Sequence, residues 1–230
     1  MAKSSLEKRI SVDDASFHFL PTVREVADKR AACLARYVFA EKFVKGRTVC
    51  DVACGTGYGS GYLARTAKRV VGIDISIEAV DWAQKHFGAD NVTFLKADVI
   101  EPWPVQGKFD VVTSFETMEH LKTPERFLDL INEHLLPGAT LLLSVPNGPC
   151  DLQNHSDNYR HLQHFSDNDL RGLLEPRFSE VECFSQIYTK NLRHYLAKVL
   201  KMRSVRLVSN YDFVPGLFLD VKTWLVVAHK

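Results

Sequence analysis

The segment from Val49 to Gly61, VCDVACGTGYGSG, is the feature that most constrains the fold of this chain. It begins as a short apolar run and continues into a cluster of glycines, which is typical of a buried strand followed by a tight turn and a helix. Glycines at such a turn let the backbone approach a ligand that lies across the ends of parallel strands. The segment therefore predicts an α/β fold with a ligand site at one edge of the sheet.

Short apolar runs alternate with helical stretches along the remaining chain. We expect a leading helix from Val23 to Phe43 and later helices over 58–67, 77–87, 124–135 and from Ser166. We expect strands over 47–53, 69–74, 91–97, 109–115, 139–145, 178–189 and 223–230, the last one antiparallel. Continuous apolar runs indicate strands that are buried on both faces. The pattern predicts a doubly wound α/β domain over residues 1–230, with 1–45 as an N-terminal strap and helix.

The charge and cysteine content exclude several classes of protein. The 29 Lys plus Arg and 28 Asp plus Glu give a formal net charge of +1, so nucleic acid or an anionic membrane would need a local patch. The five cysteines form no Cys-x-x-Cys pair, which argues against a disulfide framework or a zinc knuckle. The start, MAKSSLEKRI, lacks the apolar core of a signal peptide, and no apolar run could span a bilayer. We therefore expect a cytoplasmic protein.

The glycine-rich turn departs from the dinucleotide-binding motif. That motif requires G-x-G-x-x-G, but Ser60 or Tyr62 stands at the place of the third glycine, depending on the starting glycine. Asp51 precedes the glycines, where it could bind an ammonium group or order the turn. A nicotinamide-dependent oxidoreductase, the first alternative function, is disfavoured by these departures.

Two further strands end in carboxylates. Asp74 lies nineteen residues after Gly55, where a carboxylate can accept hydrogen bonds from both hydroxyls of a ribose. Asp98 ends the following strand. Three strand ends therefore converge on one adenosine-like ligand. Taken singly, Asp74 and Asp98 could instead be solvated strand ends or helix caps.

These motifs together resemble the class I S-adenosylmethionine-dependent methyltransferases. The shared motifs are DxACGTGxG at 51–59, GID at 72–74, AD at 97–98, FDVV at 109–112 and LPG at 136–138, within residues 30–147. The resemblance implies a seven-stranded Rossmann-like sheet and S-adenosyl-L-methionine as the cofactor. It implies that the turn holds the methionine portion, Asp74 the ribose and Asp98 the adenine edge. The implied cofactor-binding residues are Arg36, Asp51, Ala53, Gly55, Gly57, Asp74, Ile75, Asp98, Val99 and Phe115. For Arg36, pairing with the cofactor's carboxylate competes with a solvated place on a helix face.

A closer resemblance concerns the acceptor. Segments 36–40, 115–121 and 145–147 are similar to small methyltransferases found with glycosyltransferases in glycan and natural-product pathways. We therefore interpret the chain as an enzyme of glycan biosynthesis that methylates an oxygen of a sugar, sugar phosphate or related small metabolite. A protein that binds the cofactor but has no activity remains an alternative.

Acid–base residues follow the fourth predicted strand. A histidine with a carboxylate partner is a suitable general base near neutral pH, so His120 with Glu119 is the preferred catalytic pair. These two residues could instead brace the following loop. His164 is a further catalytic candidate in the polar segment 148–165, interpreted as a substrate lid, which also holds His155 and His161.

The order Glu116-x-x-Glu119-His120 followed by a later His-Phe also resembles the metal site of small-RNA 3′-terminal 2′-O-methyltransferases. We favour a site without metal, because the chain is neutral and shows no RNA-binding appendage, so nucleic acid is not the expected partner. Residues 190–206 hold six basic residues and no acid, and could contact a membrane surface or a lipid-linked substrate. The alternative for that stretch is a solvated helix face.

Overall fold

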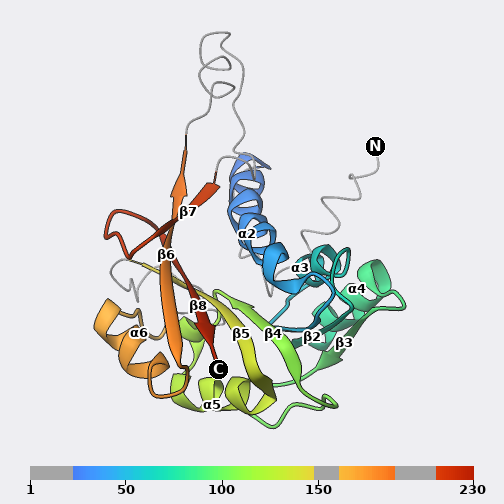
Figure 1. Ribbon diagram of the computed structural model, residues 1–230. Coiled ribbons are helices and arrows are strands. Elements are labelled where there is room, and N and C mark those ends of the chain that lie inside the picture. The colour runs from blue at the N-terminus through green and yellow to red at the C-terminus, as the bar shows by residue number, and fades with distance from the viewer. Residues whose placement is uncertain (1–22, 148–160, 190–210) are drawn as a thin grey trace.

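The computed structural model describes residues 23–147, 161–189 and 211–230. Its strands are β1 (Thr48–Val52), β2 (Arg69–Asp74), β3 (Val92–Lys96), β4 (Phe109–Phe115), β5 (Leu135–Pro146), β6 (Glu180–Tyr188), β7 (Tyr211–Pro215) and β8 (Thr223–His229). Its helices are α2 (Val23–Val44), α3 (Tyr58–Leu63), α4 (Ile77–Phe87), the 3₁₀ turn η2 (Met118–His120), α5 (Pro124–His134) and α6 (Asp167–Leu174). These elements confirm the predicted doubly wound α/β architecture (Figure 1).

The strands form one sheet in the order β3-β2-β1-β4-β5-β8-β6-β7. The five strands from β3 to β5 run parallel, and β8 pairs antiparallel with both β5 and β6. The antiparallel last strand is thus confirmed. The predicted number of seven strands was one too small, because β7 adds an eighth strand antiparallel to β6. Its sequence, YDFVP, is only five residues long, includes Asp212 and Pro215 and stays partly exposed, so it lacks the continuous apolar run of the buried strands.

Two apolar cores cover the two faces of the sheet. Consecutive side chains of a strand point to opposite faces, and β5 shows this directly. Leu141 and Leu143 pack in the core beneath α5 and α6, whereas Leu142 packs in the core beneath α2, α3 and α4. Burial on both faces explains why these strands appear in the sequence as continuous apolar runs.

Capping residues define the starts of two helices. The Ser76 hydroxyl accepts a hydrogen bond from the backbone N–H of Ala79 at the start of α4. Ser166 and Asp169 form a reciprocal capping box at the start of α6. These contacts satisfy N–H groups that have no partner inside a helix, and they confirm the predicted beginnings of both helices.

The turn after β1 requires its glycines. Gly55 and Gly57 have φ values of 56° and 76°, a left-handed conformation that glycine adopts without strain. Gly59 is the second residue of α3, where a Cβ atom would overlap the ring of Tyr37 on α2. The glycine cluster therefore serves both the turn and the close packing of α3 against α2.

Replacement of Gly59 by alanine is expected to destabilise the fold by about 1 to 3 kcal/mol, because the added methyl group would collide with the Tyr37 ring. The matched control is Gly172→Ala in α6, where an added Cβ would have no other atom within 4 Å. That control should leave stability unchanged or raise it by about 0.5 to 1 kcal/mol. Urea unfolding of both variants measures the difference, and equal stabilities would contradict the α2–α3 packing.

Several predicted features lie outside the described residues. They are the strap over residues 1–22, most of the segment interpreted as a lid at 148–160, and the basic stretch 190–206. Within the ranges that the structure does describe, no helix combines the length and apolar character needed to cross a membrane.

Candidate active site

The carboxylate of Asp74 organises the glycine turn. It lies at the end of β2, where Oδ2 accepts a hydrogen bond from Gly55 N at 2.8 Å and Oδ1 accepts one from Ser76 N at 2.9 Å. Burial raises the pKa of this carboxyl group, while the backbone donors oppose the shift. Each carboxylate oxygen can accept a second hydrogen bond, so Asp74 can order the turn and still bind ribose hydroxyls.

The neighbouring strand ends suit the other parts of a nucleoside. The side chain of Ile75, directly after Asp74, is 61% exposed and offers an apolar surface beside that carboxylate. After β3, Val99 is buried, and Asp98 accepts a hydrogen bond from Ile100 N at 3.1 Å with one oxygen, leaving the other available. A turn open to close approach, a carboxylate and an apolar surface therefore meet at one sheet edge. These residues fit an adenosine-containing cofactor such as S-adenosylmethionine.

Asp51 ties three elements together beneath the turn. This fully buried carboxylate accepts hydrogen bonds from Ser60 Oγ of α3 at 2.6 Å and from Thr113 Oγ1 of β4 at 2.7 Å. The Tyr37 hydroxyl of α2 donates a third at 3.3 Å. Burial raises the pKa of Asp51 to about 6, although the hydroxyl donors oppose the shift. Two roles were predicted for Asp51: binding an ammonium group or ordering the glycine turn. Its hydrogen bond with Ser60, just after the turn, supports the second role.

Arg36 is buried, so the interpretation of this residue as a solvated arginine is wrong. Its Nε donates a hydrogen bond to Oε1 of Gln186 in β6 at 3.0 Å, and its Nη2 lies 3.7 Å from Oε1 of Glu116. Burial is the largest single influence and would lower the pKa of the guanidinium, but Glu116 and other nearby groups together outweigh it, and the pKa is raised. Arg36 therefore carries a fixed positive charge in the interior, and its pairing with a cofactor carboxylate stays a prediction.

Glu116 directs the chain that follows β4. Its φ of 55° is in the left-handed region, which is unusual for a residue other than glycine. Its backbone N–H donates to Ser144, and the Ser144 hydroxyl donates to Oε1 of Glu116 at 2.8 Å. Strained backbone of this kind is held by its surroundings and is frequent at functional sites. The strained turn brings the next side chains to the carboxyl edge of the sheet.

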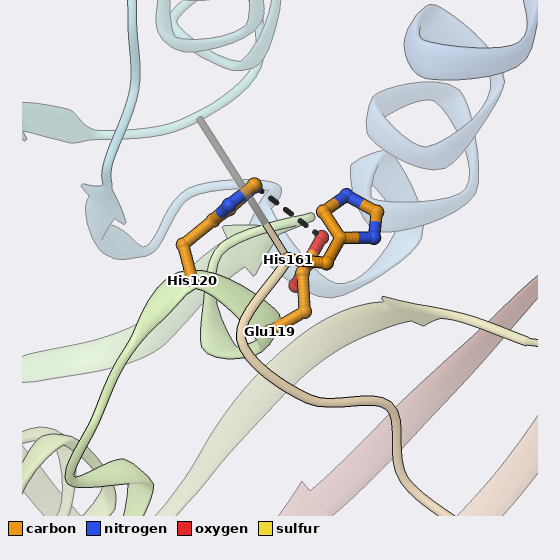
Figure 2. Close-up of side chains that lie close together, drawn as sticks. All are labelled: Glu119, His120 and His161. Carbon is orange, nitrogen blue, oxygen red and sulfur yellow. Dashed lines mark ion pairs between the residues drawn. The ribbon is translucent and has the colours of Figure 1, made fainter. Parts of the chain in front are cut away.

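Glu119 is a buried carboxylate in η2, and its side chain is 0% exposed. Neither of its carboxylate oxygens has a hydrogen-bond partner among the other described residues. Burial, followed by the negative charge of Glu116, raises its pKa well above the usual range. His120 is a charge partner of Glu119: its Nε2 lies 3.8 Å from Oε1 of Glu119 (Figure 2).

Two further histidines approach this pair. His161 Nδ1 lies at a hydrogen-bond distance of 2.7 Å from His164 Nε2, and the rings of His120 and His161 meet edge to face, 4.9 Å between centroids. The backbone N–H of Leu162 donates to the carbonyl of Glu119 at 2.8 Å, which joins the two segments. The structure thus brings together the predicted catalytic residues Glu119, His120 and His164. From the sequence, His161 was placed with His155 and His164 among lid histidines that could bind substrate, act as the base or share a metal, but only His164 was chosen as a catalytic residue. The His-x-x-His spacing of His161 and His164 was a usable signal.

The cofactor edge and this cluster are adjacent. β1 and β4 are neighbouring parallel strands, and Ser114 Oγ at the end of β4 donates to Val52 O at the end of β1, 3.1 Å away. Phe115, the last residue of β4, packs its ring edge to face against Tyr37, with centroids 4.9 Å apart. Acid–base groups therefore lie beside the turn that would hold the cofactor.

Comparison with known proteins identifies the family. The family model described as "Methyltransferase domain" matches residues 18–177. Ubiquinone biosynthesis O-methyltransferases of Schizosaccharomyces pombe and Coxiella burnetii are 34% and 30% identical over 114 residues, which are 47% and 49% of this chain. A protein of Mycolicibacterium smegmatis named "Probable S-adenosylmethionine-dependent methyltransferase" is 31% identical over 140 residues, or 60% of this chain. The matched segments span 41%, 49% and 53% of these relatives, about half their length.

Solved structures show the same fold. The DhpI–SAH complex aligns with a TM-score of 0.62 at 20% identity, covering 96% of this chain and 91% of that chain. An S-adenosylmethionine-dependent methyltransferase from Mesorhizobium loti aligns with a TM-score of 0.58 at 17% identity, covering 89% and 100%. None of these relatives is named as an enzyme of glycan biosynthesis, so the predicted similarity to glycan-associated methyltransferases stays a prediction. The fold class and S-adenosylmethionine as the cofactor are confirmed, and the chain belongs to the methyltransferase-domain family.

Proposed function

We propose that this protein is an S-adenosylmethionine-dependent O-methyltransferase that acts on a hydroxyl group of a small molecule. The observation that carries the proposal is the meeting of Glu119 and His120 with His161 and His164 beside the cofactor edge. Methylation of an oxygen requires removal of a proton, and such a cluster can accept one. The names of the relatives from S. pombe and C. burnetii, both O-methyltransferases, support the choice of oxygen.

The protein's main task in this reaction is to position the acceptor. S-adenosylmethionine supplies a methyl group on a sulfonium, which is a good leaving group. The acceptor oxygen must lie in line with the methyl carbon at about 3 to 3.5 Å. The new O–C bond forms as the C–S bond breaks, with its electron pair passing to sulfur. The hydroxyl proton passes to His120, and the buried Glu119 carboxylate 3.8 Å away stabilises the imidazolium.

For the acceptor, we propose a sugar, sugar phosphate or related polyhydroxylated metabolite, which the motifs at 36–40, 115–121 and 145–147 support. The ubiquinone biosynthesis relatives favour a second candidate class, the hydroxyl of an aromatic ring. An RNA end is less favoured, because the chain has a net charge of only +1. Formation of S-adenosylhomocysteine with matched panels of sugars, sugar phosphates, hydroxybenzenes and short RNAs distinguishes the classes.

Substitution of His120 by alanine is expected to lower the turnover rate by about a hundredfold, because a general base contributes about that factor. Affinity for S-adenosylhomocysteine should stay nearly unchanged, since His120 is not among the residues expected to bind the cofactor. His86→Ala is the matched control, because His86 stacks on Trp82 in α4. Turnover rates and calorimetric titrations of both variants are compared. Equal losses of turnover and of cofactor affinity in His120→Ala would contradict the catalytic role.

A further inference from the structure

We infer that Glu119, His120 and His161 form a binding site for a divalent transition-metal ion. One ligand atom from each side chain can be chosen so that all three atoms lie within 4.8 Å of one another. Around a bound ion, such atoms are separated by about 3 to 4 Å, given metal–ligand bonds of about 2.0 to 2.2 Å. Small rotations of the side chains therefore suffice to bind an ion. Figure 2 shows the three side chains arriving from η2 and from the segment that begins at His161.

The buried carboxylate of Glu119 is an independent observation that supports a cation-binding site. Its side chain is 0% exposed, and within the described ranges its two oxygens have no hydrogen-bond partner on another residue. Burial of a carboxylate without hydrogen-bond partners is unfavourable in free energy, and coordination of a metal ion is one of the few arrangements that compensate for it. The contact with His120, at 3.8 Å, is longer than a hydrogen bond. An ion between these groups would satisfy the carboxylate.

The other nearby carboxylate is not part of this site. Glu116 lies 3.7 Å from the guanidinium of Arg36 and accepts a hydrogen bond from the Ser144 hydroxyl at 2.8 Å. Its charge is therefore already compensated by a buried arginine. The ligand set consists of one carboxylate and two imidazoles, and Glu116 with Arg36 forms a separate pair.

His164 orients the third ligand. Because Nδ1 of His161 contacts Nε2 of His164 at 2.7 Å, Nε2 of His161 is assigned as the metal-binding atom. Hydrogen bonding of the second ring nitrogen is the usual way in which a metal-binding histidine is held. Two contacts hold this segment to η2 and the loop after it: Leu162 N with Glu119 O, and Gln163 Nε2 with Leu121 O, both at 2.8 Å. The site is therefore held together before an ion binds.

The ligand types indicate which ion is bound. Imidazole ligands suit Zn²⁺, Fe²⁺, Ni²⁺ and Cu²⁺, and the carboxylate in the set also suits Mn²⁺, whereas Mg²⁺ and Ca²⁺ prefer sites made of oxygen atoms alone. Three protein ligands leave coordination positions for water or for oxygens of a substrate. If the proposed function holds, on which this role rests, the open positions would bind the acceptor hydroxyl and lower its pKa. The ion would then replace His120 as the agent that activates the hydroxyl.

Calorimetric titration of the full chain with Zn²⁺, Mn²⁺ and Mg²⁺, without cofactor or acceptor, tests the site directly. We expect one Zn²⁺ or Mn²⁺ ion per chain with a micromolar or lower Kd, and binding of Mg²⁺ at least tenfold weaker. Glu119→Gln and His161→Gln should each weaken binding at least tenfold, with His86→Gln as the control. His161 is only partly buried, so its variant tests the site even if Glu119→Gln fails to fold. Absence of binding, or binding unchanged in both ligand variants, would overturn the inference.

The same titrations, combined with assays of methyl transfer, distinguish failure of the metal site from failure of the proposed function. Specific metal binding without methyl transfer to any hydroxyl acceptor would leave the metal site intact and contradict the proposed function. Methyl transfer that persists after exhaustive chelation, together with no specific metal binding, would overturn the metal site and leave His120 as the base.

Discussion

Replacement of Asp74 by alanine is expected to weaken binding of S-adenosylhomocysteine by about tenfold to a hundredfold, because hydrogen bonds to a charged group contribute about 1.5 to 3 kcal/mol. The substitution removes the acceptor for the ribose hydroxyls. It also releases the N–H of Gly55, which Asp74 binds at 2.8 Å, so the glycine turn would lose part of its order. Calorimetric titration of the purified variant measures the affinity directly.

Asp110 provides a matched control for Asp74. Its carboxylate also anchors a neighbouring strand, accepting hydrogen bonds from Thr48 N at 2.8 Å and Thr48 Oγ1 at 2.6 Å. These residues begin β4 and β1, at the sheet edge opposite the candidate site. Asp110→Ala should therefore reduce stability without changing cofactor affinity. Unchanged affinity in Asp74→Ala, or equal loss in both variants, would remove the ribose-binding role of Asp74.

Replacement of Asp51 by alanine is expected to destabilise the protein by about 3 to 5 kcal/mol near pH 4, because buried polar groups without a partner each cost about 1 to 3 kcal/mol. The hydroxyls of Ser60, Thr113 and Tyr37 would lose their common acceptor. The control is Asp81→Ala on the exposed face of α4, which should change stability by less than about 0.5 kcal/mol. Urea unfolding of the two variants and the parent protein provides the comparison.

The effect of Asp51→Ala should depend on pH with a definite sign. Burial raises the pKa of Asp51 from 3.8 to about 6, so the folded protein binds this proton more tightly than the unfolded chain. The contribution of Asp51 to the free energy of unfolding is therefore complete well below pH 3.8. It falls by at most about 1.4 kcal/mol per pH unit between pH 3.8 and about pH 6. The destabilisation caused by the substitution should shrink by about 2 kcal/mol between pH 4 and pH 6. A difference that is constant or grows over this range would contradict the raised pKa.

Much of the fold could be predicted because it depends on short-range patterns. The strand and glycine turn of residues 49–61, the continuous apolar runs of the parallel strands and the helix start at Ser166 each involve residues close together in sequence. The position of Asp74 at a strand end followed from the same pattern, because parallel strands place their carboxyl ends at one edge. The strand β7 was missed, since its five residues include Asp212 and Pro215 and give no such pattern.

The candidate site could be predicted only in part, for the same physical reason. Glu119 and His120 follow β4 directly, so their place at the ligand edge was predictable from the sequence. The partner of Arg36 in β6, Gln186, is 150 residues away, and Thr113, which binds Asp51, is 62 residues away. Contacts over such separations depend on how whole elements pack, which local preferences do not specify.

The sequence by itself determined the α/β fold, the cofactor edge and the residue types available for chemistry, because periodicity, glycine turns and strand ends are local properties. Only the tertiary structure decided which charges are paired and which are buried alone. In the folded chain Glu116 pairs with Arg36, whereas the carboxylate of Glu119 is buried without a hydrogen-bond donor from another described residue. His161, which is 42 residues later in the sequence, lies close to Glu119. Burial and charge pairing arise from packing between distant segments, so the arrangement on which the metal site rests becomes visible only in the folded chain.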